Sequence, residues 1–253
     1  MRIAVVGGTG TLGRQVAEEL GRRGHEVRAL SRGAREFPID LRTGEGLPEA
    51  LEGCDAVVDA SNASSATRAA ETLVEGSKRL LTAERTAGVR HHVCVSIVGC
   101  DQAGLAYYRV KTEQERVVEQ EPVPWTIVRA TQFHELVDAL FTTAARWRVI
   151  PVPRVPLQTV RSAEAARAVA DIAEGTALRE RVQVAGPEIT ELPELARSWR
   201  SITGRRVLLL PLPLPGRLGR ALRRGALTAE QPDTHGSTTF GTWLAAAHGR
   251  SRK

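Results

Sequence analysis

The chain has few cysteines and no long apolar run. Its three cysteines, Cys54, Cys94 and Cys100, cannot all pair and show no CxxC spacing, which excludes a disulfide scaffold and a cysteine-based metal centre. We interpret them as small core residues in a reducing compartment and expect no metal. No apolar segment reaches the length of a membrane span, and the chain enters a strand pattern at once, without a basic leader. We therefore expect a cytoplasmic protein.

Lysine is also scarce, with three in 253 residues, so arginine carries almost all of the net charge of +6. This usage is consistent with a GC-rich bacterial genome. The arginines are mostly scattered among acids, with no aromatic platform between them, which disfavours nucleic-acid binding. Arg217, Arg220, Arg223 and Arg224 form a basic amphipathic stretch, which we interpret as a solvated face rather than a membrane-surface helix. The expected partner is a small-molecule substrate, with no nucleic acid or membrane, in a monomer or homodimer.

Short runs rich in valine and isoleucine alternate with amphipathic stretches in the first half of the chain. Such runs are typical of parallel strands buried on both faces. The predicted strands are 2–6, 26–30, 55–59, 92–96 and 125–129, and the predicted helices are 11–23, 65–87 and 105–120. His91 and His92 begin one of these strands, where we interpret them as residues at the sheet edge. The pattern predicts an α/β fold, a Rossmann-type doubly wound parallel sheet.

The pattern changes after Ile150, because Pro151, Pro153 and Pro156 interrupt regular structure. Helices are expected over 162–174, 192–203 and 240–247, with a strand over 181–184. Prolines at 211, 213 and 215 exclude a central strand there. We expect one compact unit, with a dinucleotide-binding domain over 1–150 and a smaller substrate lobe over 151–253.

A glycine-rich turn, Gly7-Gly8-Thr9-Gly10-Thr11-Leu12-Gly13, joins the first strand to the first helix. Gly7 allows a tight turn, Gly10 lets the backbone approach a pyrophosphate, and Gly13 lets the helix pack close to the sheet. The free N–H groups of the helix N-terminus then favour a bound anion. A glycine turn in this strand–turn–helix context predicts a dinucleotide site.

The end of the second strand indicates which dinucleotide binds. NAD sites usually place an acid there for the ribose 2′-hydroxyl, but this chain has Ser31 and Arg32 and no acid until Glu36. A guanidinium matches a phosphate in charge and geometry. NADP(H) is therefore favoured over NAD(H), and a solvated surface arginine is the alternative interpretation of Arg32.

Tyr107 and Lys111 are four residues apart, so they share one face of a predicted helix. Ser96 ends a predicted strand at the carboxyl edge of the sheet, where open α/β folds bind ligands. Reduction of a carbonyl requires a proton, and a neighbouring ammonium lowers the pKa of a phenol that supplies it. We predict Tyr107, Lys111 and Ser96 as the catalytic set, with spacing favouring Tyr107 over Tyr108 as the acid.

Together these motifs resemble the short-chain dehydrogenase/reductase superfamily. The GxxGxxG spacing is similar to its extended and atypical branches, and the NmrA-like NAD(P)-binding branch fits best. Similar segments are 59–63, 95–99 and 126–134. The resemblance covers most of the chain and is specific for fold and cofactor class, but not for the reaction. The short loop after Ser96 departs from longer members, and many NmrA-like relatives without this tyrosine are regulators.

The resemblance implies a role for each matching position. It places the cofactor phosphates at residues of the glycine turn and at Ser31 and Arg32, the adenine at Asp40 and Leu41, and the riboses at Ala60, Ser61 and Lys111. The phosphate residues of the turn are Gly7, Thr9, Gly10, Thr11, Leu12 and Gly13. Thr131, Gln132 and Phe133 would flank the nicotinamide. Gln132 and Tyr108 are expected to contact the substrate. His134, which follows the fifth strand, either does the same or is a helix-start histidine with a partner inside the protein, and the sequence favours neither interpretation.

Three functions fit these residues. The first is an NADPH-dependent oxidoreductase that reduces a carbonyl or activated double bond of a small hydrophobic metabolite, with hydride from the nicotinamide and a proton from Tyr107. The second is a redox-neutral enzyme on the same scaffold, such as an isomerase, epimerase, dehydratase or cyclase. The third is a non-catalytic NADP(H)-binding sensor or regulator. The Tyr107–Lys111 pair favours catalysis over the third.

Overall fold

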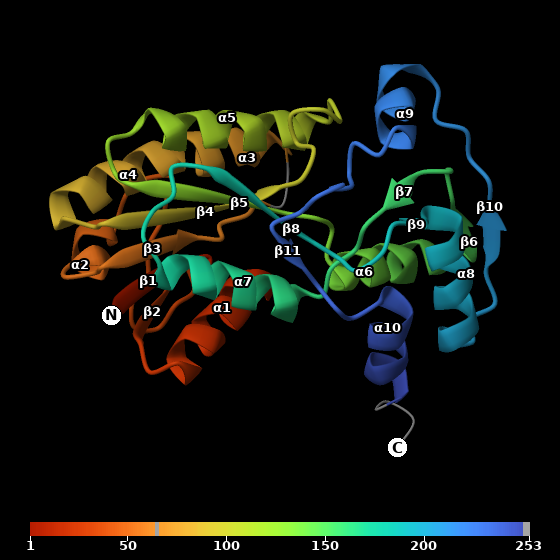
Figure 1. The fold of residues 1–253 in the computed structure, drawn as a ribbon, viewed down its shortest axis with the longest axis horizontal. Coiled ribbons are helices and arrows are strands. Elements are labelled where there is room, and N and C mark those ends of the chain that lie inside the picture. The colour runs from red at the N-terminus through yellow and green to blue at the C-terminus, as the bar shows by residue number, and fades with distance from the viewer. Residues whose placement is uncertain (64–65, 250–253) are drawn as a thin grey trace.

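A seven-stranded parallel sheet forms the centre of the larger part of the molecule in the computed structural model, which describes residues 1–63 and 66–249 (Figure 1). The strand order is β2-β1-β3-β4-β5-β8-β11. The strands are β1 (Arg2–Val6), β2 (Glu26–Leu30), β3 (Ala56–Asp59), β4 (His91–Ile97), β5 (Trp125–Ala130), β8 (Arg181–Ala185) and β11 (Thr234–His235). The predicted Rossmann-type fold is confirmed, and the predicted strands agree within one residue at either end.

Helices cover both faces of this sheet, and the alternation within β1 shows why. Ile3 and Val5 pack into the core under α1 and α7, whereas Ala4 and Val6 pack into the core on the opposite face. One face carries α1 (Thr11–Arg22) and α7 (Ser162–Glu174), and the other carries α2 (Leu47–Leu51), α4 (Gly76–Ala87) and α5 (Ala106–Gln120). A sheet buried on both faces explains why apolar residues occupy successive positions in strands such as β1 and β3.

The helix predicted over 65–87 consists of three segments. They are α3 (Ala66–Ala69), the π-helical η1 (Ala70–Glu75) and α4. Residue 65 lies outside the described residues. The spacing of apolar residues predicts a helix but does not reveal a turn with i→i+5 bonding, so the π segment was not predicted.

His91 and His92 lie in the sheet interior, so their predicted edge position is wrong. β4 is a central strand, paired with β3 on one side and β5 on the other. His92 is fully buried, and its Nδ1 lies 2.8 Å from Oε1 of the equally buried Glu84. Cys54, Cys94 and Cys100 are buried and unpaired, as predicted for core residues.

A smaller lobe packs at the carboxyl edge of the sheet, around the fully buried Trp199 and Phe240. Two short sheets pair β6 with β10 in parallel and β7 with β9 antiparallel. The lobe contains α6 (His134–Ala145), β6 (Val149–Pro151), β7 (Pro156–Leu157), β9 (Thr190–Glu191), α8 (Leu192–Thr203), β10 (Leu208–Leu210), α9 (Gly216–Arg223) and α10 (Phe240–Gly249). The prolines after β10 keep it out of the main sheet, as predicted.

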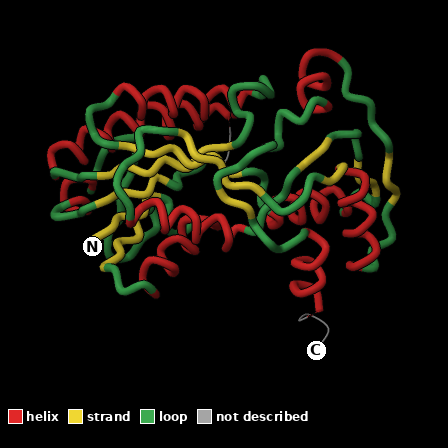
Figure 2. The backbone as a smooth tube through the Cα atoms, viewed as in Figure 1, coloured by secondary structure: helices red, strands yellow, loops and turns green. Residues whose placement is uncertain are grey.

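The chain passes between the two parts more than once. β8, β11 and α7 belong to the main sheet and its covering layer, although they follow residue 150, whereas α6 precedes residue 150 and packs in the lobe. The division into a dinucleotide-binding domain over 1–150 and a substrate lobe over 151–253 stays a prediction. Figure 2 shows that loops connect the sheet to the lobe where the two parts meet. Across the described residues, no helix has both the length and the apolar character needed to span a membrane.

Candidate active site

The turn between β1 and α1 has no space for side chains at its key glycines. Gly7 has a φ of +73°, and a Cβ added there would lie 2.7 Å from the carbonyl oxygen of Ala60. A Cβ at Gly13 would lie 2.3 Å from the carbonyl oxygen of Gly7. The Gly10 amide donates to that same Gly7 oxygen at 2.9 Å, which closes the turn. These contacts leave no room for side chains and put the N-terminus of α1 at the carboxyl ends of β1 and β3.

Next to this turn lies a cavity of about 320 Å³, which corresponds to the predicted adenine end. Ser31, Arg32, Asp40 and Leu41, which the resemblance assigns to the cofactor, line this cavity together with Arg42. The Arg42 guanidinium lies 2.7 Å from the Asp40 carboxylate and, by hydrogen bonding, lowers the pKa of that carboxyl below its usual value. Because Arg42 compensates Asp40, the one carboxylate among the described residues that line this cavity, Arg32 leaves this end with positive charge.

A second cavity of about 720 Å³ continues from the first toward the lobe. Both are lined by Gly10 and by residues 60–63, so they form one cleft across the carboxyl edge of the sheet. The other residues that line the second cavity are Thr11, Leu12, Val95, Ser96, Ile97, Tyr107, Tyr108, Lys111, Ala130, Thr131, Gln132, Phe133, Glu135, Leu136 and Ala139. Open α/β sheets bind ligands at the carboxyl edge where the direction of the strand order changes, which here is between β1 and β3.

The cleft contains hydroxyl groups that fit a polar ligand. The side-chain oxygens of Ser31, Ser61 and Thr131 are buried and have no hydrogen-bond partner among the residues that the structure describes. Buried hydroxyls are normally paired, so they mark places where a ligand or water completes the bonding. With the side-chain-free glycine turn, they fit a dinucleotide lying along the cleft from the adenine end toward Thr131.

Tyr107 reaches into the cleft from the first turn of α5. Its hydroxyl donates to Oδ1 of Asn62 at 2.5 Å, across 45 residues of sequence. Burial and the negative charge of Asp59 raise the pKa of Tyr107 to about 12. The expected lowering of this pKa by Lys111 is therefore wrong for the protein alone. At neutral pH the phenol keeps its proton and acts as a donor.

Lys111 is buried and directed at the sheet. Its Nζ donates to the carbonyl oxygen of Val95 and to Oε1 of Gln114, each at 2.7 Å. Nε2 of Gln114 in turn donates to Asp59 at 3.0 Å, and Asp59 also accepts the amide N–H of Ser61 at 2.9 Å. This chain of bonds fixes the lysine and links it to the loop after β3.

Ser96 lines the cleft, but its hydroxyl is engaged elsewhere. It donates to Oε1 of the fully buried Glu115 at 2.5 Å, and Arg129 holds the same carboxylate with bonds of 2.9 and 2.6 Å. Because its one proton goes to Glu115, Ser96 can offer a substrate only lone pairs. A donor role for Ser96 toward a substrate oxygen would require this bond to break.

Most of the other predicted residues come together in the cleft, and His134 does not. Tyr108, Gln132 and Phe133 line it, whereas His134 is fully buried at the start of α6. Its Nδ1 lies 2.9 Å from the Thr159 hydroxyl and its Nε2 lies 3.0 Å from a backbone carbonyl oxygen. With both ring nitrogens bonded inside the lobe, the predicted substrate role of His134 is corrected to a structural one. Burial also lowers its pKa.

Sequence reasoning missed several residues of the cleft. Asn62 follows the recognised segment after β3, but nothing in the sequence links it to Tyr107. Glu135, Leu136 and Ala139 come from the first turns of α6, whose direction depends on how the lobe packs. Arg42 lies only two residues after Asp40, and this proximity was the one signal that could have revealed their ion pair.

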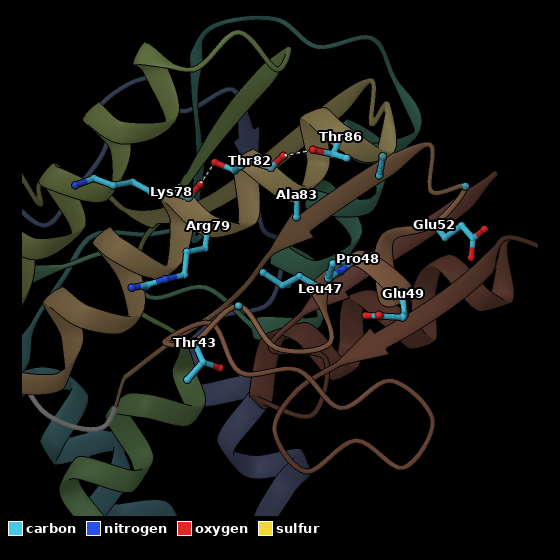
Figure 3. A pocket seen from close by; sticks show the side chains of 13 residues that line it. Thr43, Leu47, Pro48, Glu49, Glu52, Lys78, Arg79, Thr82, Ala83 and Thr86 are labelled. Atoms are coloured by element: carbon cyan, nitrogen blue, oxygen red, sulfur yellow. Dashed lines mark hydrogen bonds between the residues drawn. The ribbon is translucent and has the colours of Figure 1, made fainter.

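A separate cavity, of about 1000 Å³, is a groove between α2 and α4 that shares no lining residue with the cleft (Figure 3). Leu47, Glu49 and Glu52 line one side, with Arg79 and Thr82 on the other. It lies on the outer surface of the helical layer and contains neither the glycine turn nor the tyrosines. The residues predicted to carry chemistry therefore lie in the cleft and not in this groove.

Comparison with known proteins identifies the family of the chain. A sequence family described as NAD(P)H-binding matches residues 7–173. Over 151 residues the chain is 33% identical to the photosystem II assembly factor Ycf39 of Synechocystis sp., a match covering 53% of this chain and 45% of that protein. The chain matches about half the length of such curated relatives.

Solved structures show the fold over the whole chain. The NADPH complex of Escherichia coli quinone oxidoreductase QOR2 has a TM-score of 0.82 at 19% identity, covering 97% of this chain and 99% of that one. A short-chain dehydrogenase/reductase superfamily protein of Agrobacterium tumefaciens with bound NAD has a TM-score of 0.80 at 18% identity, covering 100% and 98%. With the family match over more than half of its length, the chain belongs to the NAD(P)H-binding family and has the atypical short-chain dehydrogenase/reductase fold.

Proposed function

We propose that this protein is an NADPH-dependent oxidoreductase that reduces a carbonyl or an activated double bond of a small hydrophobic metabolite. The observation that carries the proposal is the continuity of the cleft. The same residues, Gly10 and 60–63, line the basic end suited to a dinucleotide and the end that contains Tyr107. A nucleotide lying along the glycine turn would thus reach the tyrosine.

The lining of the wider end supports a hydrophobic substrate. Leu12, Phe133, Leu136 and Ala139 contribute apolar surface, and the rings of Tyr107 and Tyr108 pack edge to face, 6.5 Å apart. Small-molecule sites commonly combine such apolar walls with a few polar groups that fix orientation. Here those polar groups would be Tyr107, Asn62 and Thr131.

Bound NADPH would supply a hydride. Tyr107 would supply the proton, since its pKa of about 12 keeps the phenol protonated at neutral pH. A substrate oxygen would replace Asn62 as the acceptor of the Tyr107 hydrogen bond. As negative charge develops on that oxygen, the phenolic proton would transfer to it. Because Lys111 does not lower the pKa of Tyr107 in the protein alone, it would stabilise the resulting phenolate only once ligand binding brings its Nζ toward the ring. Asp59 and Gln114 hold Lys111 in place until then.

We also infer a preference for NADPH over NADH. Arg32 lies at the end of β2 in the adenine cavity, and Arg42 compensates the nearby Asp40. A 2′-phosphate would pair with the Arg32 guanidinium, whereas a ribose hydroxyl would leave that charge without a partner.

The buried, unpaired state of all three cysteines also supports the expected cytoplasmic location.

A second candidate function is a non-catalytic nucleotide-binding factor. The observation that favours it is that Lys111 is bonded to Val95 and Gln114 while the pKa of Tyr107 is raised. The photosystem II assembly factor Ycf39 is 33% identical over the matched region. Such a protein would bind NADP(H) through the same cleft without turning it over.

NADPH oxidation by the purified protein distinguishes the two. The experiment follows the absorbance of NADPH in the presence of quinones, azo compounds and enones. A control without any acceptor measures background oxidation. Acceptor-dependent oxidation that the Tyr107→Phe variant loses supports the oxidoreductase. Tight NADPH binding by calorimetry with no oxidation by any acceptor supports the second candidate. Failure to bind either pyridine nucleotide contradicts both.

A further inference from the structure

One segment of the lobe carries positive charge without any compensating acid. Residues 195–229 contain eight arginines and no aspartate or glutamate. The chain has 35 basic and 29 acidic residues, so the remaining 27 basic residues face all 29 acids, and the rest of the chain is net negative by two. The net charge of +6 therefore originates entirely in this segment.

These arginines are available to a partner. Arg205, Arg206, Arg217, Arg220, Arg223 and Arg224 are exposed, and none of them forms a salt bridge within residues 1–63 and 66–249. By contrast, exposed arginines elsewhere, such as Arg14 and Arg116, pair with a glutamate one turn away on the same helix. Arg223 donates to the carbonyl oxygen of Leu214, and Arg205 lies over the Trp199 ring, but neither contact neutralises the charge. Guanidinium groups without an acid partner, gathered on one lobe, favour an anionic partner.

An apolar sheet face lies within the same segment. β10 is the outermost strand of the lobe, on the side away from the main sheet (Figure 1). Leu208 and Leu210 are 60% and 46% exposed, whereas Leu209 between them packs against the lobe core. Leu212, after Pro211, is 44% exposed and extends the apolar strip. The inner face of this two-stranded sheet is thus covered and its outer face is not.

A tryptophan completes this face. Trp147 is 81% exposed on the turn from α6 to β6, between two further exposed arginines, Arg146 and Arg148. The Leu208 amide donates to the carbonyl oxygen of Arg148 at 2.9 Å, which holds the turn beside the start of β10. Tryptophan and arginine beside exposed leucines are the side chains that suit a membrane–water interface.

We propose that this side of the lobe, defined by Trp147, Leu208, Leu210, Leu212 and the six exposed arginines from Arg205 to Arg224, docks peripherally on a lipid surface with anionic headgroups. Arginines would contact the phosphates, and the leucines and tryptophan would enter the headgroup region. An RNA would satisfy the charge but leave the apolar strip exposed to water, so a bilayer fits the face better. The proposal reverses our expectation of a solvated face and does not depend on the proposed reductase activity.

Vesicle co-sedimentation tests the proposal with the full chain. We expect binding to phosphatidylcholine vesicles containing phosphatidylglycerol and none to phosphatidylcholine alone. Each arginine near such a surface strengthens binding about fivefold, so R206Q/R217Q/R220Q should weaken it about a hundredfold. The matched control R85Q/R116Q/R167Q removes the same charge from exposed positions on α4, α5 and α7, and its binding should change little. Equal losses in both triple variants would overturn the proposal.

The apolar strip has a separate test that leaves the charge unchanged. W147S/L208S should weaken vesicle binding, with the far-ultraviolet circular dichroism spectrum as a check of folding. Anionic vesicles should also shift the emission of Trp147 to shorter wavelength, and W147F should lose that shift. No binding of the unmodified protein to anionic vesicles contradicts the proposal. So does tighter binding to a single-stranded RNA that W147S/L208S leaves unchanged.

Discussion

The two ends of the cleft differ in where their lining comes from. Most residues of the basic end lie in the segments that directly follow β1, β2 and β3, and they include the guanidinium groups of Arg32 and Arg42. Most side chains of the other end come from β4, β5, α5 and α6 and are largely apolar. This end depends on contacts between distant elements, such as the bond between Asn62 and Tyr107, which are 45 positions apart.

We expect the two ends to have different functions, one in cofactor binding and the other in the chemical step. The basic end provides charge and backbone N–H groups, which give affinity for a phosphate without taking part in a reaction. The apolar end provides the phenols of Tyr107 and Tyr108 and a buried lysine, which would matter only if a bond is made or broken. Substitutions at one end should therefore change binding or turnover, but not both, and residues 60–63 between them should change both.

The largest expected effect is at the apolar end. Tyr107→Phe should reduce turnover with an active acceptor by about 10²–10⁴-fold, because it removes the proton donor. The dissociation constant for NADPH should stay within about twofold, since the phenol lies away from the phosphate site. Steady-state kinetics and calorimetry measure the two quantities.

Tyr108→Phe is the matched control for this substitution. It removes the neighbouring phenol from the same cleft and should leave turnover nearly unchanged. If Tyr108→Phe is the more damaging variant, the second tyrosine is the donor and the assignment of Tyr107 is wrong.

The basic end should show the opposite behaviour. Arg32→Ala should weaken NADPH binding by about 10–100-fold, the value of a charge-assisted bond to phosphate, and leave NADH binding unchanged. Fluorescence titration with both coenzymes measures this. Arg35→Ala, an exposed arginine three residues on that does not line the cavity, is the control. Equal weakening of both coenzymes by Arg32→Ala would remove the 2′-phosphate contact.

The two ends also differ in how far the sequence predicted them. The glycine turn and Arg32 lie in consecutive elements, so local spacing was enough to place them in the cleft. His134 was misplaced because its direction depends on bonds to Thr159 and Thr238, which lie 25 and 104 residues further on. The raised pKa of Tyr107 was missed for a similar reason, since it depends on burial by the assembled fold.

The link between the ends was predicted least well. Lys111 and Gln114 are three residues apart on one helix, and this spacing is evident from the sequence. Gln114 and Asp59 are 55 residues apart, and only the packing of α5 on the sheet brings them within 3.0 Å. Local patterns therefore predicted the elements and the cofactor turn, and they could not predict side-chain bonds between distant elements.

A smaller effect, felt at both ends, is expected at this link. Gln114→Met keeps the side-chain length and leaves the buried Asp59 and Lys111 each without one hydrogen bond, which should cost about 1–3 kcal/mol of unfolding free energy. Urea denaturation measures the loss. Because Asp59 also holds the Ser61 amide, both coenzyme affinity and turnover should fall modestly. Gln102→Met, at an exposed glutamine, is the control and should change neither.

The smallest effect is a titration that leaves the protein unchanged at neutral pH. In Tyr108→Phe, the remaining phenol of Tyr107 should ionise at about pH 12 instead of its usual value near 10, because burial and Asp59 disfavour the phenolate. The folded protein keeps this proton to higher pH than the unfolded chain. The stabilising effect of the protonated phenol is therefore complete below about pH 10 and is lost as the pH rises toward 12. Ultraviolet absorbance of the phenolate measures the ionisation. An apparent pKa below 10 in the protein without nucleotide would mean that Lys111 lowers the pKa of Tyr107 after all. Tyr107 would then be prepared as a base before any ligand binds.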